Sequence, residues 1–181
     1  MPVDAVGLQP GEEMALRGDT WVRAFPTVHP VPSQGYLLLS RRHKLRPEYA
    51  GLPGPEIRAL RERGVAVTEA VDSPEVAFTG DTSLEFVDLC CEKDPQVLKA
   101  KLLILELTFV DDDVTPEGAR EMGHGHVQDL LARIDRFRDV GHVLLIHFSA
   151  RYKAQQVREA LEAHLPDWFK AKCTLLLERY A

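Results

Sequence analysis

Five acidic and imidazole side chains stand at or near the ends of apolar segments, where their chemistry could be combined. Asp81 ends the run EVAFTGD, Glu106 interrupts LLILELTF, and His147 closes HVLLIHF. His29 lies in a proline-rich loop after WVRAF, and His124 belongs to the phrase GHGH. Imidazoles and carboxylates are zinc ligands, and they are also common general acids and bases. The set therefore predicts a metal site with an acid–base pair at the strand ends of an α/β fold.

Each of these residues alone also has a structural interpretation. A short carboxylate such as Asp81 in GDTS can cap a turn by accepting backbone N–H groups. Glu106 could pair with a local base, and His147 could be a core histidine whose hydrogen bonds are satisfied. Short motif matches are frequent by chance, so the prediction of a metal site depends on the five residues taken together.

The periodicity of apolar residues predicts the elements that would position them. Strands are expected over residues 21–25, 35–40, 65–70, 75–81, 101–109, 142–148 and 173–180. Helices are expected over residues 55–64, 126–140 and 152–165. A basic segment with several prolines and glycines, residues 41–55, is expected to lack regular structure. Strands alternate with helices from about residue 75, which is typical of an α/β layered fold.

Composition narrows the class of protein. The chain has 181 residues, with 22 Lys and Arg against 28 Asp and Glu, and a formal net charge of −6. This acidic balance excludes a general nucleic-acid coat but allows a local basic patch. No apolar run reaches the ~20 residues of a membrane span, and the first residues do not resemble a signal peptide. Cys90, Cys91 and Cys173 lack zinc-finger or disulfide spacing, so we expect a reducing, cytoplasmic environment.

The order of several segments resembles the tRNase Z family, in its short, plant-like form, within the metallo-β-lactamase superfamily. The segments are AFPTVHPVPSQGY, KLRPEYAGLPGPEI, EVAFTGDTS, LLILELTFVDDD, GHGH and LLIHFSARY. The resemblance implies a zinc-dependent endoribonuclease that removes the 3′ trailer from tRNA precursors. It also implies that residues 1–181 are a single partial domain, the C-terminal part of an αββα sandwich.

The resemblance further implies which residues bind metal. His29 and His147 would each bind one of two zinc ions, and Asp81 would bridge the two ions. The phrase HxHxDH, which family members carry in their first half, is absent from this sequence. The remaining ligands are fewer than the four that zinc usually takes, so we expect weak or partial zinc binding. We also expect a homodimer or another partner to cover the sheet face that the missing half would cover.

The same resemblance assigns roles in catalysis and substrate binding. Glu106 and His124 would form the pair that positions and protonates the leaving group. His126 is the alternative to His124, because GHGH offers two candidates. Ser149 and Arg151 would lie beside the scissile phosphate, where a guanidinium can donate two parallel hydrogen bonds.

Charge runs give two further expectations. The basic residues within 41–46 and 58–63 are either ordinary solvated charges or contacts to tRNA phosphates. The acidic run 111–113 is expected to be a solvated loop that faces away from RNA, because its charge would repel phosphate.

The function therefore has more than one candidate. The first is the tRNA-processing endoribonuclease with an incomplete metal site. The alternative is a catalytically inactive fragment or interaction module of a full-length subunit with the metallo-β-lactamase fold. A third candidate keeps the fold but acts on another phosphodiester or ester. The phrase HFSARY and the basic loop favour the RNA enzyme over this third candidate.

Overall fold

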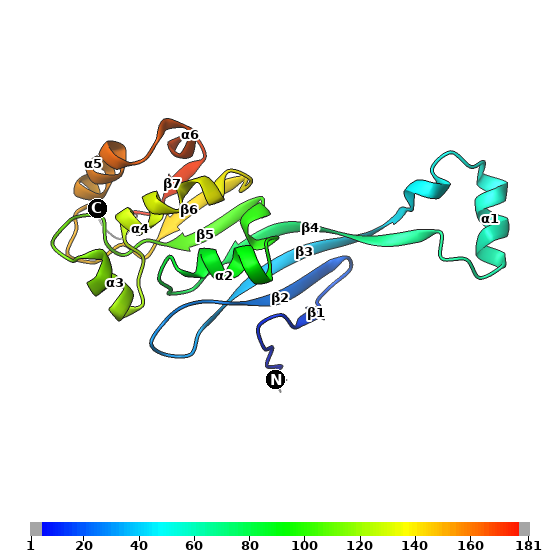
Figure 1. The fold of residues 1–181 in the computed structure, drawn as a ribbon, viewed down its shortest axis with the longest axis horizontal. Coiled ribbons are helices and arrows are strands. Elements are labelled where there is room, and N and C mark those ends of the chain that lie inside the picture. The colour runs from blue at the N-terminus through cyan, green and yellow to red at the C-terminus, as the bar shows by residue number, and fades with distance from the viewer. Residues whose placement is uncertain (1–4, 178–181) are drawn as a thin grey trace.

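The structure, a computed structural model, describes residues 5–177 and contains one seven-stranded mixed sheet in chain order (Figure 1). The antiparallel part consists of β1 (Glu13–Ala15), β2 (Thr20–Pro26), β3 (Gln34–Leu45) and β4 (Thr68–Phe78). The part parallel to β4 consists of β5 (Leu102–Glu106), β6 (His142–Ile146) and β7 (Cys173–Leu175). The carboxyl ends of β4, β5 and β6 therefore meet at one edge of the sheet.

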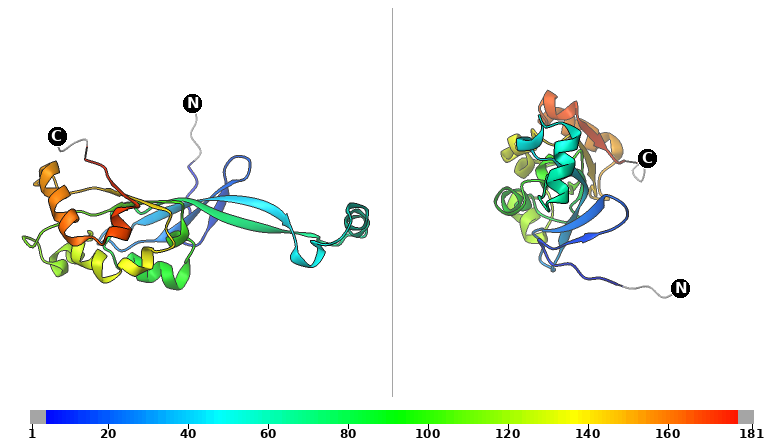
Figure 2. Two further views of the ribbon diagram at one scale, coloured as in Figure 1. Left: turned by 90° about the horizontal axis from the view of Figure 1, so that it is seen from above. Right: turned by 90° about the vertical axis from the view of Figure 1, so that its right-hand side faces the viewer.

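Helices gather on one side of this sheet (Figure 2). They are α2 (Phe86–Lys93), α3 (Pro116–Met122), α4 (Val127–Ala132), α5 (Ala154–His164), α6 (Asp167–Lys170) and the short 3-10 helices η2 (Val97–Lys99) and η3 (Ile134–Phe137). A row of fully buried residues crosses β3 to β6 and belongs to the same core cluster as Phe86 of α2: Leu37, Ala77, Leu103 and Val143. The expected α/β layering is confirmed.

The opposite face of the sheet is also apolar. A second row across β3 to β6 consists of Tyr36, Phe78, Ile104 and Leu144. Tyr36 and Phe78 are 40% and 43% exposed, and the other two are half-buried. None of the helices in the described part of the chain covers this face (Figure 2). The face is therefore a candidate for packing against another layer.

Strands β3 and β4 continue beyond the sheet as a two-stranded arm (Figure 1). The arm ends in the 3-10 helix η1 (Pro47–Tyr49) and α1 (Gly54–Glu62). The prediction of irregular structure over 41–55 was wrong for its first residues, because β3 runs on to Leu45 and pairs there with Thr68. Residues 65–70 and 75–81, predicted as two strands, contribute instead to one strand, β4, which passes through Pro74 without ending.

The helix at the tip follows its prediction closely. Pro55 lies in the first turn of α1, and Gly64 follows the last turn with a φ of +78°, a conformation that glycine adopts without strain.

Three other predicted elements are shorter than expected. The helix expected over 126–140 divides into α4 and η3, which meet at Arg133. The strand expected over 101–109 ends at Glu106, whose side chain is committed to the site described below. The last strand ends at Leu175, and residues 178–180 of its prediction lie outside the described residues.

The cysteines are small side chains inside or beside the core. Cys90 is buried, Cys91 and Cys173 are half-buried, and all three are free. Burial raises the pKa of the Cys90 thiol to about 12, so it stays a thiol at neutral pH. Within residues 5–177, no helix has the length and apolar character that crossing a membrane requires.

Candidate metal centre

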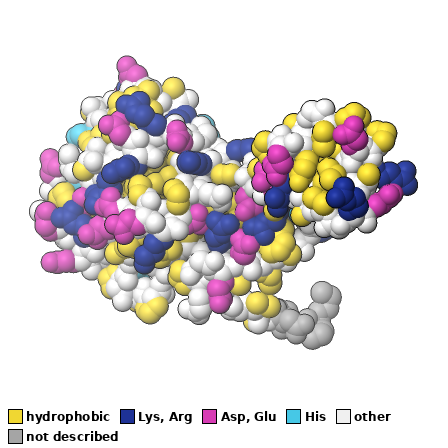
Figure 3. Space-filling view, turned by 45° about the vertical axis from the view of Figure 1, so that its right-hand side comes forward, with side chains coloured by type: hydrophobic (Ala, Val, Ile, Leu, Met, Phe, Trp, Pro, Cys, Tyr) yellow, Lys and Arg dark blue, Asp and Glu magenta, His cyan; other side chains and the backbone are white. Residues whose placement is uncertain are grey.

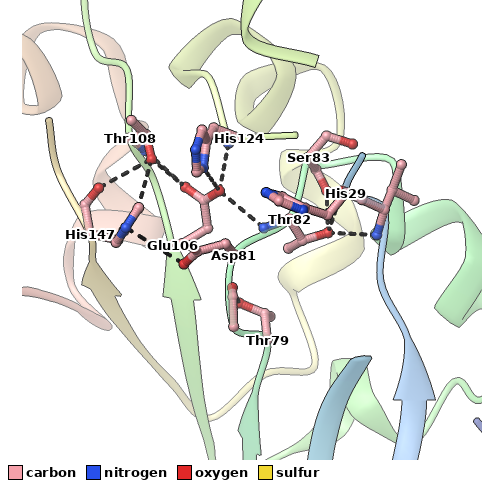
Figure 4. Close-up of polar contacts among 12 residues, drawn as sticks. His29, Thr79, Asp81, Thr82, Ser83, Glu106, Thr108, His124 and His147 are labelled. Atoms are coloured by element: carbon pink, nitrogen blue, oxygen red, sulfur yellow. Dashed lines mark hydrogen bonds and ion pairs between the residues drawn. The ribbon is translucent and has the colours of Figure 1, made fainter. Parts of the chain in front are cut away.

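Asp81, His124 and His147 converge at the carboxyl edge of the parallel strands (Figure 4). Asp81 follows β4, His147 follows β6, and His124 lies in the connection between α3 and α4. One ligand atom from each residue lies within 4.8 Å of the others. Nε2 of His147 is 3.6 Å from Oδ1 of Asp81. Two ligands about 2.1 Å from one tetrahedral zinc are about 3.4 Å apart, so the donor types and this spacing fit a metal ion.

Glu106 is fully buried behind this group and accepts five hydrogen bonds. Its Oε1 faces the backbone N–H groups of Thr82 and Gly125, at 3.1 and 3.0 Å, and Nδ1 of His124 at 3.0 Å. Its Oε2 accepts from the N–H of Thr108 at 3.0 Å and from the hydroxyl of Thr108 at 2.8 Å. Donors therefore surround both oxygens, and the side chain acts as an acceptor that orients its neighbours.

His124 is the residue that Glu106 orients most directly. The hydrogen bond from Nδ1 to the Glu106 carboxylate raises the pKa of His124, and the charge of Asp81 adds to this effect, while burial opposes it. His124 therefore holds a proton more readily than an ordinary histidine. His126, the alternative partner, faces elsewhere: it caps α4 by accepting the N–H of Gln128, and its Nε2 bonds to the carbonyl of Asp111.

Two glycines explain why His124 can sit so close to its partners. Gly123 has a φ of +80°, and a Cβ there would lie 2.3 Å from Pro30 and 2.5 Å from His29. A Cβ on Gly125 would lie 2.6 Å from Leu84 and 3.0 Å from the Glu106 carbonyl oxygen. The pattern Gly–His–Gly therefore allows the surrounding loops to close around His124.

His29 lies beside the group, although it is outside the three-residue cluster. Its ring centroid is 5.7 Å from that of His124. Its loop is tied to the segment after Asp81, because Thr82 and Ser83 both hydrogen-bond to Val28. Nδ1 of His29 lies 3.1 Å from the backbone nitrogen of Val31 and 3.3 Å from the carbonyl oxygen of Val31, so these contacts fit either tautomer of the ring. His29 can bind metal through Nε2 only in the tautomer with the proton on Nδ1, and its role as a ligand stays a prediction.

His147 has an unusual backbone conformation. Its φ is +61°, and it is the only non-glycine residue of the described chain with a positive φ. Such strain persists only where surrounding contacts impose it, and it concentrates at functional sites. Here the conformation turns the chain sharply at the end of β6, and the side chain, 44% exposed, lies beside Asp81.

The chain is similar in sequence to several proteins that are named tRNase Z or ribonuclease Z. The chain is 45% identical over 161 residues to tRNase Z TRZ1 of Arabidopsis thaliana, covering 89% of this chain and 56% of that protein. It is 31% identical over 198 residues to ribonuclease Z of Haloferax volcanii, covering 88% of this chain and 59% of that protein. The chain belongs to the tRNase Z family. It spans somewhat more than half the length of these two curated relatives, and no protein-family model matches the sequence.

The fold expectation is confirmed in the same way. The metallo-β-lactamase fold protein YhfI from Bacillus subtilis superimposes with a TM-score of 0.55 at 16% identity, covering 96% of this chain and 52% of that protein. The structure therefore has the α/β architecture of part of a metallo-β-lactamase fold.

The structure changes the interpretation of Arg151 and of the acidic run. The Arg151 guanidinium pairs with the Asp111 carboxylate and lies 2.6 Å from the Tyr152 hydroxyl. The expectation that residues 111–113 simply form a solvated loop was therefore wrong for Asp111, which is half-buried and forms an ion pair with Arg151. Ser149 is half-buried, and its N–H donates to the Thr108 carbonyl. The predicted contacts of Ser149 and Arg151 with a phosphate stay predictions.

The predicted basic residues lie along the arm and at its tip, and some of them form ion pairs with acidic side chains. Arg41 donates to Asp72 and Glu13 and lies over the ring of Trp21, 4.2 Å from the ring centroid. Arg58 pairs with Glu62 on the surface of α1. Lys and Arg mix with acidic and apolar side chains at the tip (Figure 3). Arg41 is therefore a structural residue, and the arm is not uniformly basic.

Sequence reasoning missed Thr108 and Thr82. Both donate to Glu106, and the Thr82 hydroxyl also accepts the N–H of Val28. The only signal in the sequence was that Thr82 directly follows Asp81 in GDTS and that Thr108 stands two positions after Glu106 in ELTF.

Proposed function

We propose that this chain carries the acid–base pair and part of the metal site of a zinc-dependent endoribonuclease that removes the 3′ trailer of tRNA precursors. The observation that supports this most is the buried Glu106 hydrogen-bonded to His124, with His124 in ligand range of Asp81 and His147. A buried carboxylate that orients a histidine beside a metal-type cluster suits phosphodiester hydrolysis. Membership of the tRNase Z family favours a tRNA precursor as substrate.

Asp81 and His147 would hold zinc, together with His29 once its Nε2 is free. When bound, zinc acts as a Lewis acid and lowers the pKa of water to about 7, so a nucleophile exists at neutral pH. If His124 serves as the acid, the described cluster leaves Asp81 and His147 as ligands. Even with His29 this makes three candidate ligands, fewer than the usual four. We therefore expect weak or partial zinc binding by the chain alone.

His124 would act as the general acid. Its Nδ1–H would remain hydrogen-bonded to the Glu106 carboxylate, while its Nε2–H would be donated to the leaving oxygen of the phosphodiester. The raised pKa of His124 favours the protonated ring that this step requires. Glu106 keeps its role as an acceptor throughout, because donors surround both of its oxygens.

The open sheet face supports a second candidate, a catalytically inactive interaction module. Tyr36, Phe78 and Leu176 are exposed apolar side chains, and Tyr36 and Phe78 lie together on that face. A homodimer or a partner with a second apolar sheet would bury them.

We place residues 1–181 in a single partial domain. We also propose a reducing, cytoplasmic location because all three cysteines are free.

A reconstitution experiment separates the two candidates. A labelled tRNA precursor with a short 3′ trailer is incubated with the 181-residue chain, with and without the HxHxDH-bearing half of tRNase Z TRZ1 expressed as a separate polypeptide. We expect no cleavage by the chain alone and cleavage at the trailer junction by the mixture. A mixture that assembles, as sedimentation shows, but does not cleave favours the interaction module. Robust cleavage by the chain alone contradicts the incomplete metal site.

A further inference from the structure

The hydroxyl of Thr108 lies between the buried carboxylate and the third residue of the cluster (Figure 4). Thr108 Oγ1 is 2.8 Å from Oε2 of Glu106 and 3.0 Å from Nδ1 of His147. It is also 3.2 Å from the carbonyl oxygen of His147. A hydroxyl has one hydrogen to donate and two lone pairs that accept, so these contacts cannot all be of the same kind.

The position of the hydroxyl proton follows from what surrounds Glu106. Three backbone N–H groups, those of Thr82, Thr108 and Gly125, donate to Glu106, and donors of this kind favour the ionised carboxylate. The Thr108 hydroxyl therefore donates its one hydrogen at its shortest contact, to Oε2 at 2.8 Å and not to the His147 carbonyl at 3.2 Å, and it presents a lone pair to Nδ1 of His147. Nδ1 must then carry the proton, and Nε2 of the neutral ring has a free lone pair.

We propose that Thr108 is a positioning residue that fixes His147 in the tautomer with a free Nε2. This inference rests on the proposed metal site, because the free lone pair on Nε2 of His147 matters for function only if Nε2 binds a metal ion. Nε2 is the ring nitrogen that lies 3.6 Å from Oδ1 of Asp81. A neutral histidine ring in water favours the other tautomer, with the proton on Nε2. The hydroxyl therefore selects the form that can bind a metal ion before any ion arrives.

The arrangement gives one buried carboxylate control over two rings. Oε1 of Glu106 bonds to Nδ1 of His124 directly, and Oε2 acts on Nδ1 of His147 through the Thr108 hydroxyl. Both rings then turn their Nε2 atoms away from the carboxylate. Because the hydroxyl hydrogen is committed to Glu106, a valine at position 108 would keep the shape and remove the relay.

The test is the nitrogen NMR spectrum of the metal-free 181-residue chain. Long-range proton–nitrogen correlation at a pH where the rings are neutral distinguishes the two tautomers, and Thr108→Val, Thr108→Ser and His147→Ala are compared with the unmodified chain. His147→Ala assigns the signals. We expect Nδ1–H with an unprotonated Nε2 in the unmodified chain and in Thr108→Ser, and a shift toward Nε2–H in Thr108→Val. Nε2–H in the unmodified chain, or an unchanged tautomer in a folded Thr108→Val, overturns the proposal.

A cobalt titration of the same variants links the tautomer to metal binding. We expect Thr108→Val to weaken Co²⁺ binding by about 10–100-fold and Thr108→Ser to restore it, as for other residues that orient metal ligands. Equal affinities of Thr108→Val and the unmodified chain contradict a positioning role in metal binding. A fixed tautomer with no Co²⁺ binding by any form leaves the selection by Thr108 intact and instead counts against the proposed metal site. If Thr108→Val does not fold, the spectrum of the unmodified chain still decides the tautomer.

Discussion

Nε2 of His147 lies 3.6 Å from Oδ1 of Asp81, although the two residues are 66 positions apart and follow different strands. Both side chains are about half exposed, so a cation can reach them from solvent. We expect Asp81→Asn to weaken Co²⁺ binding by at least about tenfold, because the amide retains the shape but not the charge. Absorption spectroscopy of the Co²⁺ complex measures the affinity. Asp112→Asn, on an exposed acidic residue outside the cluster, is the control. Equal affinities of the two variants would contradict the site.

Glu106→Gln tests the acceptor role of the buried carboxylate. The amide NH₂ would face donors and leave buried groups unpaired, so we expect a loss of about 2–3 kcal/mol in the free energy of unfolding. The pKa of His124 should fall, because the hydrogen bond to this carboxylate is the main cause of its elevation. Urea unfolding measures the first effect, and an NMR titration of His124 measures the second. Glu121→Gln, at an exposed position on α3, should change neither. An unaltered His124 titration in Glu106→Gln would disprove the pairing.

His124 and His126 are separated by comparing rate with stability. In the reconstituted enzyme, we expect His124→Ala to lower the cleavage rate by about 10²–10⁴-fold while metal binding remains, as for a lost acid–base group. His126→Ala removes the cap of α4 and should cost about 1 kcal/mol of stability with little effect on rate. Single-turnover cleavage and urea unfolding are measured for both. A larger loss of rate from His126→Ala would reverse the assignment.

The close approach of the His29 loop to Gly123 gives a fourth prediction. Gly123→Ala would place a Cβ 2.3 Å from Pro30 in a backbone with a φ of +80°. We expect a loss of about 1–3 kcal/mol in the free energy of unfolding and a displaced His29 loop. Gly51→Ala is the matched control, because nothing lies within 4 Å of its Cβ. Equal urea midpoints for the two variants would show that the loop is not packed there.

Sequence patterns were enough to predict the strands and helices whose buried apolar residues recur at regular spacing. The alternation of WVRAF predicted β2, and the apolar spacing of residues 152–165 predicted α5. The arm was different, because neither face of its outer part packs against the core and RRHKL carries no apolar alternation. Residues 41–45 are a strand because they pair with residues 68–72. The sequence of the segment alone does not predict this pairing.

The sequence predicted some residues of the candidate site and not others, for a similar reason. The residue types of Asp81, Glu106 and His147 could be read from strand ends, because parallel strands bring their carboxyl ends together. The role of Thr108 could not, since it depends on a ring 39 positions away and on the direction of a single hydroxyl hydrogen. The two histidines of GHGH were equivalent in the sequence, and only the packing against Glu106 and the cap of α4 distinguishes them.

The root of the arm gives the last prediction, on pH. Arg41 donates to Asp72 at 2.7 and 2.8 Å, directly across the strand pair, and also contacts Glu13 at 2.7 Å. Hydrogen bonds from Arg41 are the largest cause lowering the pKa of both carboxyl groups from ordinary values of 3.8 for Asp72 and 4.5 for Glu13. Carboxyl groups with a lowered pKa in the folded state stabilise it above their unfolded pKa, and this contribution is lost as pH falls through the folded pKa.

We therefore expect Arg41→Gln to cost about 1–3 kcal/mol at pH 7, because hydrogen bonds to charged groups are lost. The difference from the unmodified chain should shrink steadily as pH falls below about 4.5, since both proteins then carry protonated carboxyl groups at the root of the arm. Urea unfolding between pH 7 and pH 3 measures this. Arg58→Gln is the control, because its pair with Glu62 has side chains 83% and 68% exposed and should contribute little at any pH. A difference between Arg41→Gln and the unmodified chain that stays constant with pH would show that Arg41 acts through its packing on Trp21, at 4.2 Å, and not through the carboxylates.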